Sequence, residues 1–128
     1  MILDTNALSG AADGDPGPLE IIAGAERIAV PVIVLGEYRL GIAQSRHRKE
    51  YKEYEEWLRE WVAAVTVLDV DRETTYQYTK IGLELKKTCK PIPSNDLWIA
   101  ALCGQHSMPL LSRDRHFDVV AGLKRFEW

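Results

Sequence analysis

Residues 1–6 read Met-Ile-Leu-Asp-Thr-Asn, so the chain opens with an apolar stretch that runs directly into an acid. Strands of a parallel sheet are covered on both faces and therefore read as short continuous apolar runs. We expect residues 2–3 to form a buried strand that ends at Asp4. Two short hydrogen-bonding side chains, Thr5 and Asn6, follow the acid. This stretch predicts a polar site at the carboxyl end of the strand, where ligands of parallel sheets gather.

Further short apolar runs recur along the chain, separated by longer segments with helical spacing. They cover residues 28–30, 65–68, 110–111 and 123–126. Strands that alternate with helices are typical of βαβ units and a parallel sheet, so the sequence predicts an α/β fold. The expected helices cover residues 18–24, 32–45, 48–64, 71–87 and 95–106, with a short helical turn near 116–120.

Two segments rich in turn-forming residues interrupt this pattern. Residues 10–18 read Gly-Ala-Ala-Asp-Gly-Asp-Pro-Gly-Pro, and we expect a surface loop because such a composition does not propagate a helix. Residues 87–94 contain two prolines that stiffen the approach to the next helix. Ser94 or Asn95 can cap that helix, which leaves Asp96 in its first turn.

Size and charge exclude several classes of protein. With 128 residues and 46% hydrophobic content, residues 1–128 are expected to form one domain. The net charge of −3 gives no global positive field, so any contact with nucleic acid must use a local patch. The chain shows neither a signal-peptide pattern nor a run of about 18 apolar residues, and we expect a cytoplasmic protein without a membrane span. Cys89 and Cys103 lack metal-ligand spacing and are expected to be reduced thiols.

Four acids lie at the end of an expected strand or inside an apolar helix: Asp4, Glu37, Asp96 and Asp114. In a parallel sheet the strands point the same way, so Asp4 and Asp114 should project from the same edge. Asp96 lies in the first turn of a helix, and Glu37 lies in an apolar helix that directs it toward the protein. Buried carboxylates without partners cost several kcal/mol each. The four acids together predict a site for a cation.

The expected ligands are hard oxygen atoms, which favour Mg²⁺ or Mn²⁺ over Zn²⁺. An ion of this kind polarises a phosphodiester and lowers the pKa of a bound water, which predicts metal-dependent phosphodiester hydrolysis. Thr5, Asn6 and Ser112 are placed to hydrogen-bond the acids and orient them.

Four segments together resemble PIN-domain ribonucleases, in particular VapC-type toxins of bacterial toxin–antitoxin pairs. They are Asp4-Thr5-Asn6, Glu37 within its apolar helix, residues 95–101 (Asn-Asp-Leu-Trp-Ile-Ala-Ala) and residues 111–117 (Leu-Ser-Arg-Asp-Arg-His-Phe). The resemblance implies an α/β/α sandwich around a five-stranded parallel sheet and an endoribonuclease that depends on Mg²⁺ or Mn²⁺. It also implies a homodimer that is inhibited by a small cognate antitoxin.

By position, Asp4, Glu37 and Asp96 match the core acidic triad of the resembled family. Asp114 matches a fourth acidic position that varies more within that family, and Asp118 is an alternative for it. The metal ligands implied in this way are Asp4, Asp96 and Asp114.

Two other functions fit the same acids. A phosphatase of the haloacid-dehalogenase type would phosphorylate Asp4, although that chemistry needs an aspartate where Asn6 stands. A metal-binding module that recruits proteins without turnover is the second alternative. Asp69 and Asp71 also follow a strand and compete for the metal, but Asp71 is better explained as a helix cap and Asp69 as a solvated acid.

Basic and aromatic side chains supply candidate contact surfaces. Arg113 and Arg115 flank Asp114 and are candidates to bind RNA phosphate, with His116 beside them. A second basic cluster reads either as a solvated helix end or as a contact for RNA or antitoxin, and it consists of Arg46, His47, Arg48, Lys49 and Lys52. An apolar stripe on helix 48–64 reads either as core or as a partner surface, and it consists of Tyr51, Tyr54, Trp57, Leu58, Trp61 and Val65.

Overall fold

The computed structural model describes residues 1–44 and 48–128, together with their side chains other than those of residues 48 and 49. The strands are β1 (Ile2–Leu3), β2 (Ala29–Pro31), β3 (Thr66–Leu68), β4 (Leu110–Leu111) and β5 (Arg125–Phe126). The helices are α1 (Thr5–Ala12), α2 (Pro16–Gly24), α3 (Val32–Ala43), α4 (Arg48–Ala64), α5 (Arg72–Lys87), α6 (Ser94–His106) and the 3₁₀ helix η1 (Arg115–Val119).

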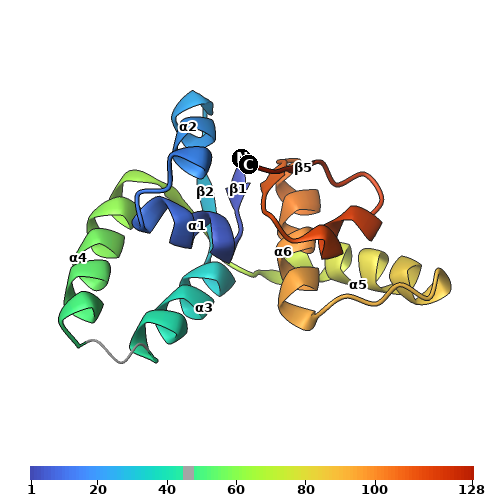
Figure 1. Cartoon of the computed structure of the whole chain (residues 1–128). Coiled ribbons are helices and arrows are strands. Elements are labelled where there is room, and N and C mark those ends of the chain that lie inside the picture. Colours follow the sequence, from blue (N-terminus) through green and yellow to red (C-terminus); the bar gives the residue numbers. More distant parts are fainter. Residues whose placement is uncertain (45–47) are drawn as a thin grey trace.

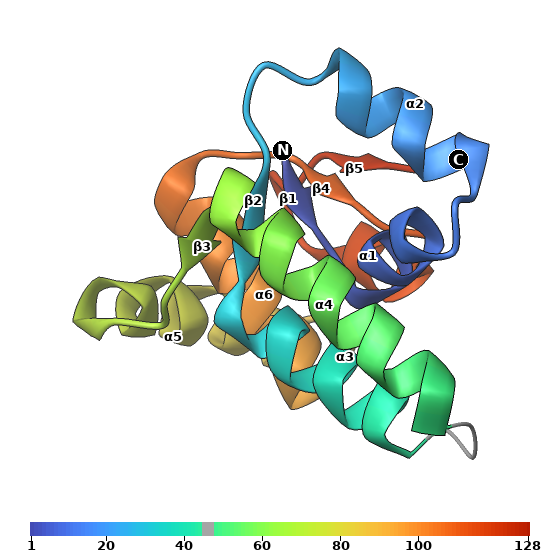
Figure 2. The same ribbon diagram turned by 90° about the vertical axis from the view of Figure 1, so that its left-hand side faces the viewer.

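The five strands form one sheet in the order β3-β2-β1-β4-β5, and every neighbouring pair is parallel. Helices α1 and α4 lie on one side of this sheet, and α5 and α6 lie on the other (Figure 1). Seen from the side, α4 crosses in front of the strands (Figure 2). The predicted α/β fold with a central five-stranded parallel sheet is confirmed.

The central strands β1 and β4 carry the core. Their residues Ile2, Leu3, Leu110 and Leu111 are fully buried, because helices cover both faces of the sheet. The helices contribute Leu8, Val34, Leu58, Ile99, Leu102 and Phe117, among others.

The apolar stripe of α4 serves the core. Leu58 is fully buried, and Tyr54, Trp57, Trp61 and Val65 pack against the core, with Trp57 and Trp61 stacked 5.6 Å apart. Tyr51 is the more exposed end of the stripe.

The prediction of a surface loop over residues 10–18 is wrong. Helix α1 continues through Ala12, α2 begins at Pro16, and only residues 13–15 connect them. Asp15 accepts a hydrogen bond from the Gly17 amide and caps α2, whose proline lies in the first turn, where no amide hydrogen is needed. Gly14, with φ of +76°, makes the turn.

Helix ends elsewhere follow the sequence more closely. Asp71 caps α5 in a reciprocal capping box with Thr74, as predicted. The predicted side-chain cap of α6 is wrong, because Pro93 precedes the helix and makes no side-chain cap. Cys89 and Cys103 are free thiols, the first exposed and the second buried. Among the described helices, none is long and apolar enough to cross a membrane.

Replacement of Leu111 by alanine should lower the free energy of unfolding by about 2–5 kcal/mol, because it opens a cavity beside β1 in the centre of the core. Leu83, which is 53% exposed on α5, supplies the control, and Leu83→Ala should change stability by less than about 0.5 kcal/mol. Urea unfolding measures both, and equal effects of the two substitutions would contradict this account of the core.

Candidate functional site

Parallel pairing of β1 with β4 creates the centre of the site. Leu3 pairs with Leu111, so the next residues along, Asp4 and Ser112, leave the sheet side by side. The Ser112 hydroxyl donates to Asp4 Oδ2 at 2.6 Å, and both residues are buried. The Thr5 amide donates to Asp4 Oδ1 at 2.8 Å, so Asp4 also caps α1. Two strands and one helix therefore fix this carboxylate.

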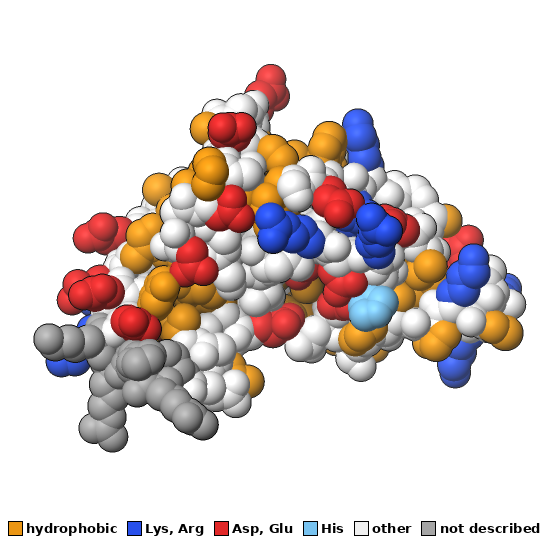
Figure 3. Space-filling view, in the orientation of Figure 1, with side chains coloured by type: hydrophobic (Ala, Val, Ile, Leu, Met, Phe, Trp, Pro, Cys, Tyr) orange, Lys and Arg blue, Asp and Glu red, His pale blue; other side chains and the backbone are white. Residues whose placement is uncertain are grey.

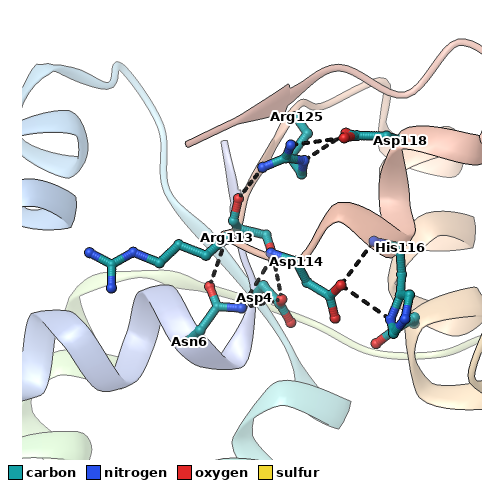
Figure 4. A network of polar contacts seen from close by, with 9 residues as sticks. Asp4, Asn6, Arg113, Asp114, His116, Asp118 and Arg125 are labelled. Atoms are coloured by element: carbon teal, nitrogen blue, oxygen red, sulfur yellow. Dashed lines mark hydrogen bonds and ion pairs between the residues drawn. The ribbon is translucent and has the colours of Figure 1, made fainter. Parts of the chain in front are cut away.

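Asn6 ties the segment after β4 to the end of β1 (Figure 4). Its side-chain amide donates to Asp4 Oδ2 at 2.9 Å and to Ser112 Oγ at 3.3 Å, and its carbonyl oxygen accepts from the Arg113 amide at 3.1 Å. The Asp114 amide donates to Ser112 Oγ at 2.9 Å. The predicted orienting residues Asn6 and Ser112 thus lie against Asp4, whereas the hydroxyl of Thr5 is buried and without a hydrogen-bond partner in the described part of the chain.

Glu37 and Asp96 reach the same region from two further helices. Helix α3 starts directly after β2 at the carboxyl edge of the sheet and carries Glu37 in its second turn. Asp96 lies in the first turn of α6, where the helix dipole favours a negative charge, and its side chain is 15% exposed. Glu37 Oε1 is buried with no hydrogen-bond partner among the described residues.

Asp114 completes the acidic cluster, which we define as Asp4, Glu37, Asp96 and Asp114. It caps η1 by accepting from the His116 amide at 2.9 Å. His116 Nδ1 lies 3.1 Å from Asp114 Oδ1 and 3.4 Å from Asp96 Oδ2. One ligand atom from each of Asp96, Asp114 and His116 falls within 4.8 Å of the others. Acidic side chains gather beside a histidine near the centre of this face (Figure 3).

Burial and mutual repulsion dominate the electrostatics of the cluster. Burial raises the pKa of Asp4, and repulsion from Asp114 adds to the rise. Burial also raises the pKa of Glu37, as do the charges of Asp4 and Asp96, whereas the nearby side chains of Asn95 and Thr5 lower it in part. Burial raises the pKa of Asp96 as well, and repulsion from Asp114 and Asp4 adds to the rise. These carboxyl groups are close enough to oppose one another's ionisation.

The donor set fits a divalent cation with hard-ligand preference. It offers carboxylate oxygens from separate elements, one of them the orphaned Glu37 Oε1, and the charge of a cation would relieve the repulsion that raises these pKa values. Mg²⁺ and Mn²⁺ favour such oxygen ligands. Among the described residues, the ligand atoms that converge within 4.8 Å belong to Asp96, Asp114 and His116, and these are the residues that would hold an ion. Asp4, a predicted ligand, is not part of this group.

Other acids considered from the sequence lie outside the cluster. Asp118 forms a two-point ion pair with Arg125, at 2.7 Å from Nε and 3.0 Å from Nη2, which lowers the pKa of Asp118. The same Arg125 donates to the Ser112 carbonyl at 2.9 Å (Figure 4). Asp118 is therefore paired with Arg125, whereas Asp114 lies beside Asp96 and His116. Asp69 is exposed, and Asp71 caps α5.

The predicted basic contacts are distributed unevenly. Arg115 lines a groove of about 420 Å³ next to Asp114 and His116, together with Lys90, which the sequence analysis missed. Arg113 lines a second groove of about 610 Å³ on the other side, beside Asn6. Arg46 lies outside the described residues, as do the side chains of Arg48 and Lys49.

The fold and the site define an α/β protein with a carboxylate cluster at the carboxyl edge of a parallel sheet. The sequence profile of the PIN domain matches residues 1–123, and the chain belongs to this family. It is 25% identical over 126 residues to Ribonuclease VapC5 of Mycobacterium tuberculosis, covering 98% of this chain and 91% of that protein. It is 29% identical to Ribonuclease VapC2 of Rickettsia felis, covering 99% and 96%. The resemblance to VapC-type proteins is thus confirmed.

Solved structures share the fold. FitAcB from Neisseria gonorrhoeae superposes with a TM-score of 0.86 at 26% identity, over 98% of this chain and 95% of the other. VapBC2 from Rickettsia felis, bound to a DNA fragment from its promoter, gives a TM-score of 0.84 at 24% identity, over 99% and 97%. At 24% identity, the likeness to VapBC2 supports a shared fold alone.

Without divalent ions at pH 7, Asp96→Asn should unfold at a higher temperature than the wild type. A raised pKa means that the folded state binds the Asp96 proton more tightly than the unfolded state does. The stability that this proton contributes is greatest below the ordinary carboxyl pKa. It is lost as the pH rises through the raised pKa of Asp96. The difference between the two proteins should therefore shrink as the pH approaches about 4.

Asp118→Asn is the matched control for this measurement, since its ionised form is the one favoured in the fold, and its midpoint should not rise at pH 7. Thermal unfolding followed by circular dichroism decides the sign. A lower midpoint for Asp96→Asn would show that its charge stabilises the ion-free fold.

Proposed function

We propose that this chain is a metal-dependent endoribonuclease and acts as the toxin of a type II toxin–antitoxin pair. The observation that carries the proposal is the convergence of the acidic cluster from four separate elements, with raised pKa values for Asp4, Glu37 and Asp96. The chain belongs to the PIN domain family, and its relatives VapC5 and VapC2 are ribonucleases, which supports the same reaction. Clustered carboxylates that resist ionisation are typical of sites that function with a bound cation.

Asp4, Asp96 and Asp114 are proposed to hold Mg²⁺, for which Mn²⁺ substitutes. When bound, such an ion neutralises charge on the phosphate and makes water more acidic. Glu37 is proposed to act catalytically: its buried Oε1 is positioned to accept a hydrogen bond from the attacking water and to hold its proton. Ser112 and Asn6 keep Asp4 in one orientation, because both donate to its Oδ2.

The groove next to Asp114 and His116 is proposed to receive the RNA backbone. Lys90 and Arg115 line it and are both exposed, so their charges can pair with phosphate. Arg113 is assigned a similar role on the opposite side. Arg46, Arg48 and Lys49 remain predicted RNA or antitoxin contacts.

The proposed partners are a cognate antitoxin protein and a second copy of the chain. Support for an antitoxin comes from two structures that share this fold: VapBC-5 from Mycobacterium tuberculosis, a member of the VapBC family of toxin–antitoxin systems, and a toxin–antitoxin complex from Klebsiella pneumoniae. We propose a cytoplasmic location, in line with an RNA substrate.

The phosphatase alternative gains no support from the geometry. Asp4 is 5% exposed, and both of its carboxylate oxygens accept hydrogen bonds, so it is poorly placed to attack a phosphoester. The binding-module alternative shares the acidic cluster and differs only in turnover.

The Asp4→Asn, Asp96→Asn double variant should cut total cellular RNA at least about a hundredfold more slowly than the wild type, because it removes two proposed ion ligands. The assay contains Mg²⁺ or Mn²⁺; EDTA should stop cleavage by the wild type, and excess ion should restore it. Unchanged cleavage by the double variant would refute the proposal. A wild type that is stabilised by Mn²⁺ yet cuts no RNA would instead support the binding module.

Ser112→Ala should raise the Mn²⁺ concentration for half-maximal cleavage by about 10–100-fold, with much of the rate recovered at saturation. The reason is that Asp4 loses its shortest hydrogen bond and part of its orientation. Thr79→Ala, which removes a hydroxyl that bonds only to the backbone of α5, is the control. An identical Mn²⁺ requirement in both variants would contradict the role given to Ser112.

A further inference from the structure

The groove on the α1 side of the acidic cluster contains an arginine held by an aromatic ring and a carboxylate. The Arg113 guanidinium carbon lies 4.5 Å from the centroid of the Trp128 ring. Arg113 Nη2 lies 3.5 Å from Asp15 Oδ2, and the indole of Trp128 donates to that same oxygen at 3.3 Å. Three residues far apart in the sequence thus hold one another at the edge of this groove.

The ring is itself seated by the backbone of α2. A Cβ atom at Gly17 would collide with the Trp128 indole, so the absence of a side chain there makes room for it. Asp15 uses its other oxygen to accept from the Gly17 amide, which fixes the carboxylate at the start of the helix. The Trp128 ring and the Asp15 carboxylate therefore each have contacts with α2 that do not involve Arg113.

Stability alone explains this arrangement poorly. The Arg113 side chain is 54% exposed, and exposed ion pairs contribute between about zero and 1 kcal/mol. The 3.5 Å contact with Asp15 is an ion pair and not one of the hydrogen bonds of the described residues, so the guanidinium N–H donors remain available for a ligand. A planar cation that is restrained yet open to solvent loses little conformational freedom when it binds phosphate.

The direction of the side chain indicates which phosphate it would meet. The Arg113 backbone lies between Ser112 and Asp114, whereas its side chain extends away from Asp114 and His116 (Figure 4). The guanidinium therefore reaches a position beside the acidic cluster and not over it. A phosphate bound there would neighbour the one that is cleaved.

We propose that Trp128 and Asp15 are positioning residues that hold Arg113 to bind an RNA phosphate flanking the cleaved bond. The inference rests on the proposed ribonuclease function and adds to it a subsite on the α1 side of the cluster. The stacked indole restrains the plane of the guanidinium, and the carboxylate restrains its rotation. Loss of the ring should therefore weaken RNA binding although no charge is removed.

Binding of a fluorescein-labelled, random-sequence, single-stranded RNA 20-mer by the full chain tests this inference, with EDTA present to prevent cleavage. Arg113→Ala should weaken binding about three- to tenfold and reduce the slope of log affinity against log salt by about 0.7, the contribution of one phosphate contact. Trp128→Leu should weaken binding in the same range, and Trp128→Phe, which keeps an aromatic face, should restore most of it.

Lys124→Ala is the matched control, because Lys124 lies 4.7 Å over the ring of Phe126 in an equivalent cation–aromatic pair outside this groove. It should leave RNA affinity unchanged. If Trp128→Leu fails to fold, Gly17→Ala is the second variant. Alanine is favourable in a helix and alters no charge, but its Cβ atom displaces the Trp128 indole. It should therefore weaken RNA binding as Trp128→Leu does.

The inference would be overturned if Trp128→Leu and Gly17→Ala both bound RNA with the affinity of the wild type, or if Arg113→Ala did so. Cleavage of RNA by the wild type with Mn²⁺, measured in parallel, reports on the proposed function separately. RNA binding that depends on Trp128 without any cleavage would retain the subsite and refute the nuclease. Cleavage with no effect of Trp128 or Gly17 would retain the nuclease and refute the subsite.

Discussion

Everything at this site depends on the pairing of two short parallel strands. Because Leu3 is in register with Leu111, and the Asp4 amide donates to the Leu111 carbonyl, the next residues along the two strands emerge together. Both of these residues, Asp4 and Ser112, are polar. A slip of one residue in this register would separate the 2.6 Å hydrogen bond and would also turn buried leucines to the other face. The apolar core therefore fixes the polar site, and strands only two residues long are sufficient because both faces are covered.

Burial and mutual repulsion oppose the ionised form of the carboxyl groups in the acidic cluster. Hydrogen bonds from Thr5, Asn6 and Ser112 lower the pKa of Asp4, yet burial outweighs them and the pKa remains raised. The hydrogen bonds therefore orient the Asp4 carboxylate, but they do not offset the cost of burying its charge. Burial likewise raises the pKa of Glu37, whose Oε1 has no hydrogen-bond partner among the described residues. Such sites reduce the stability of the ion-free protein and persist where function requires them, since a cation converts the same repulsion into binding energy.

Much of this arrangement was predictable from the sequence, because apolar runs followed by acids mark strand ends wherever they occur. Asp4 and Asp114, with their neighbours Asn6 and Ser112, could be named in this way, whereas Glu37 and Asp96 were named as acids in apolar helices. Local composition misled the prediction for residues 10–18, since caps from Asp4 and Asp15 start helices that glycine and proline would otherwise discourage. The contact of Trp128 with Gly17 and Asp15 joins positions more than 100 residues apart and has no local signal.

The segment after β4 directs its side chains to two different surfaces, the acidic cluster and the groove proposed to bind substrate. In an extended chain, alternate side chains point to opposite sides. Ser112 and Asp114 accordingly face the acidic cluster, whereas Arg113, between them, points into the groove beside Trp128 (Figure 4). Its backbone amide still donates to Asn6, so the cluster gains support from a residue whose side chain serves a different surface. A change of side chain at this position can therefore alter the proposed substrate contact while the backbone hydrogen bond to Asn6 stays in place.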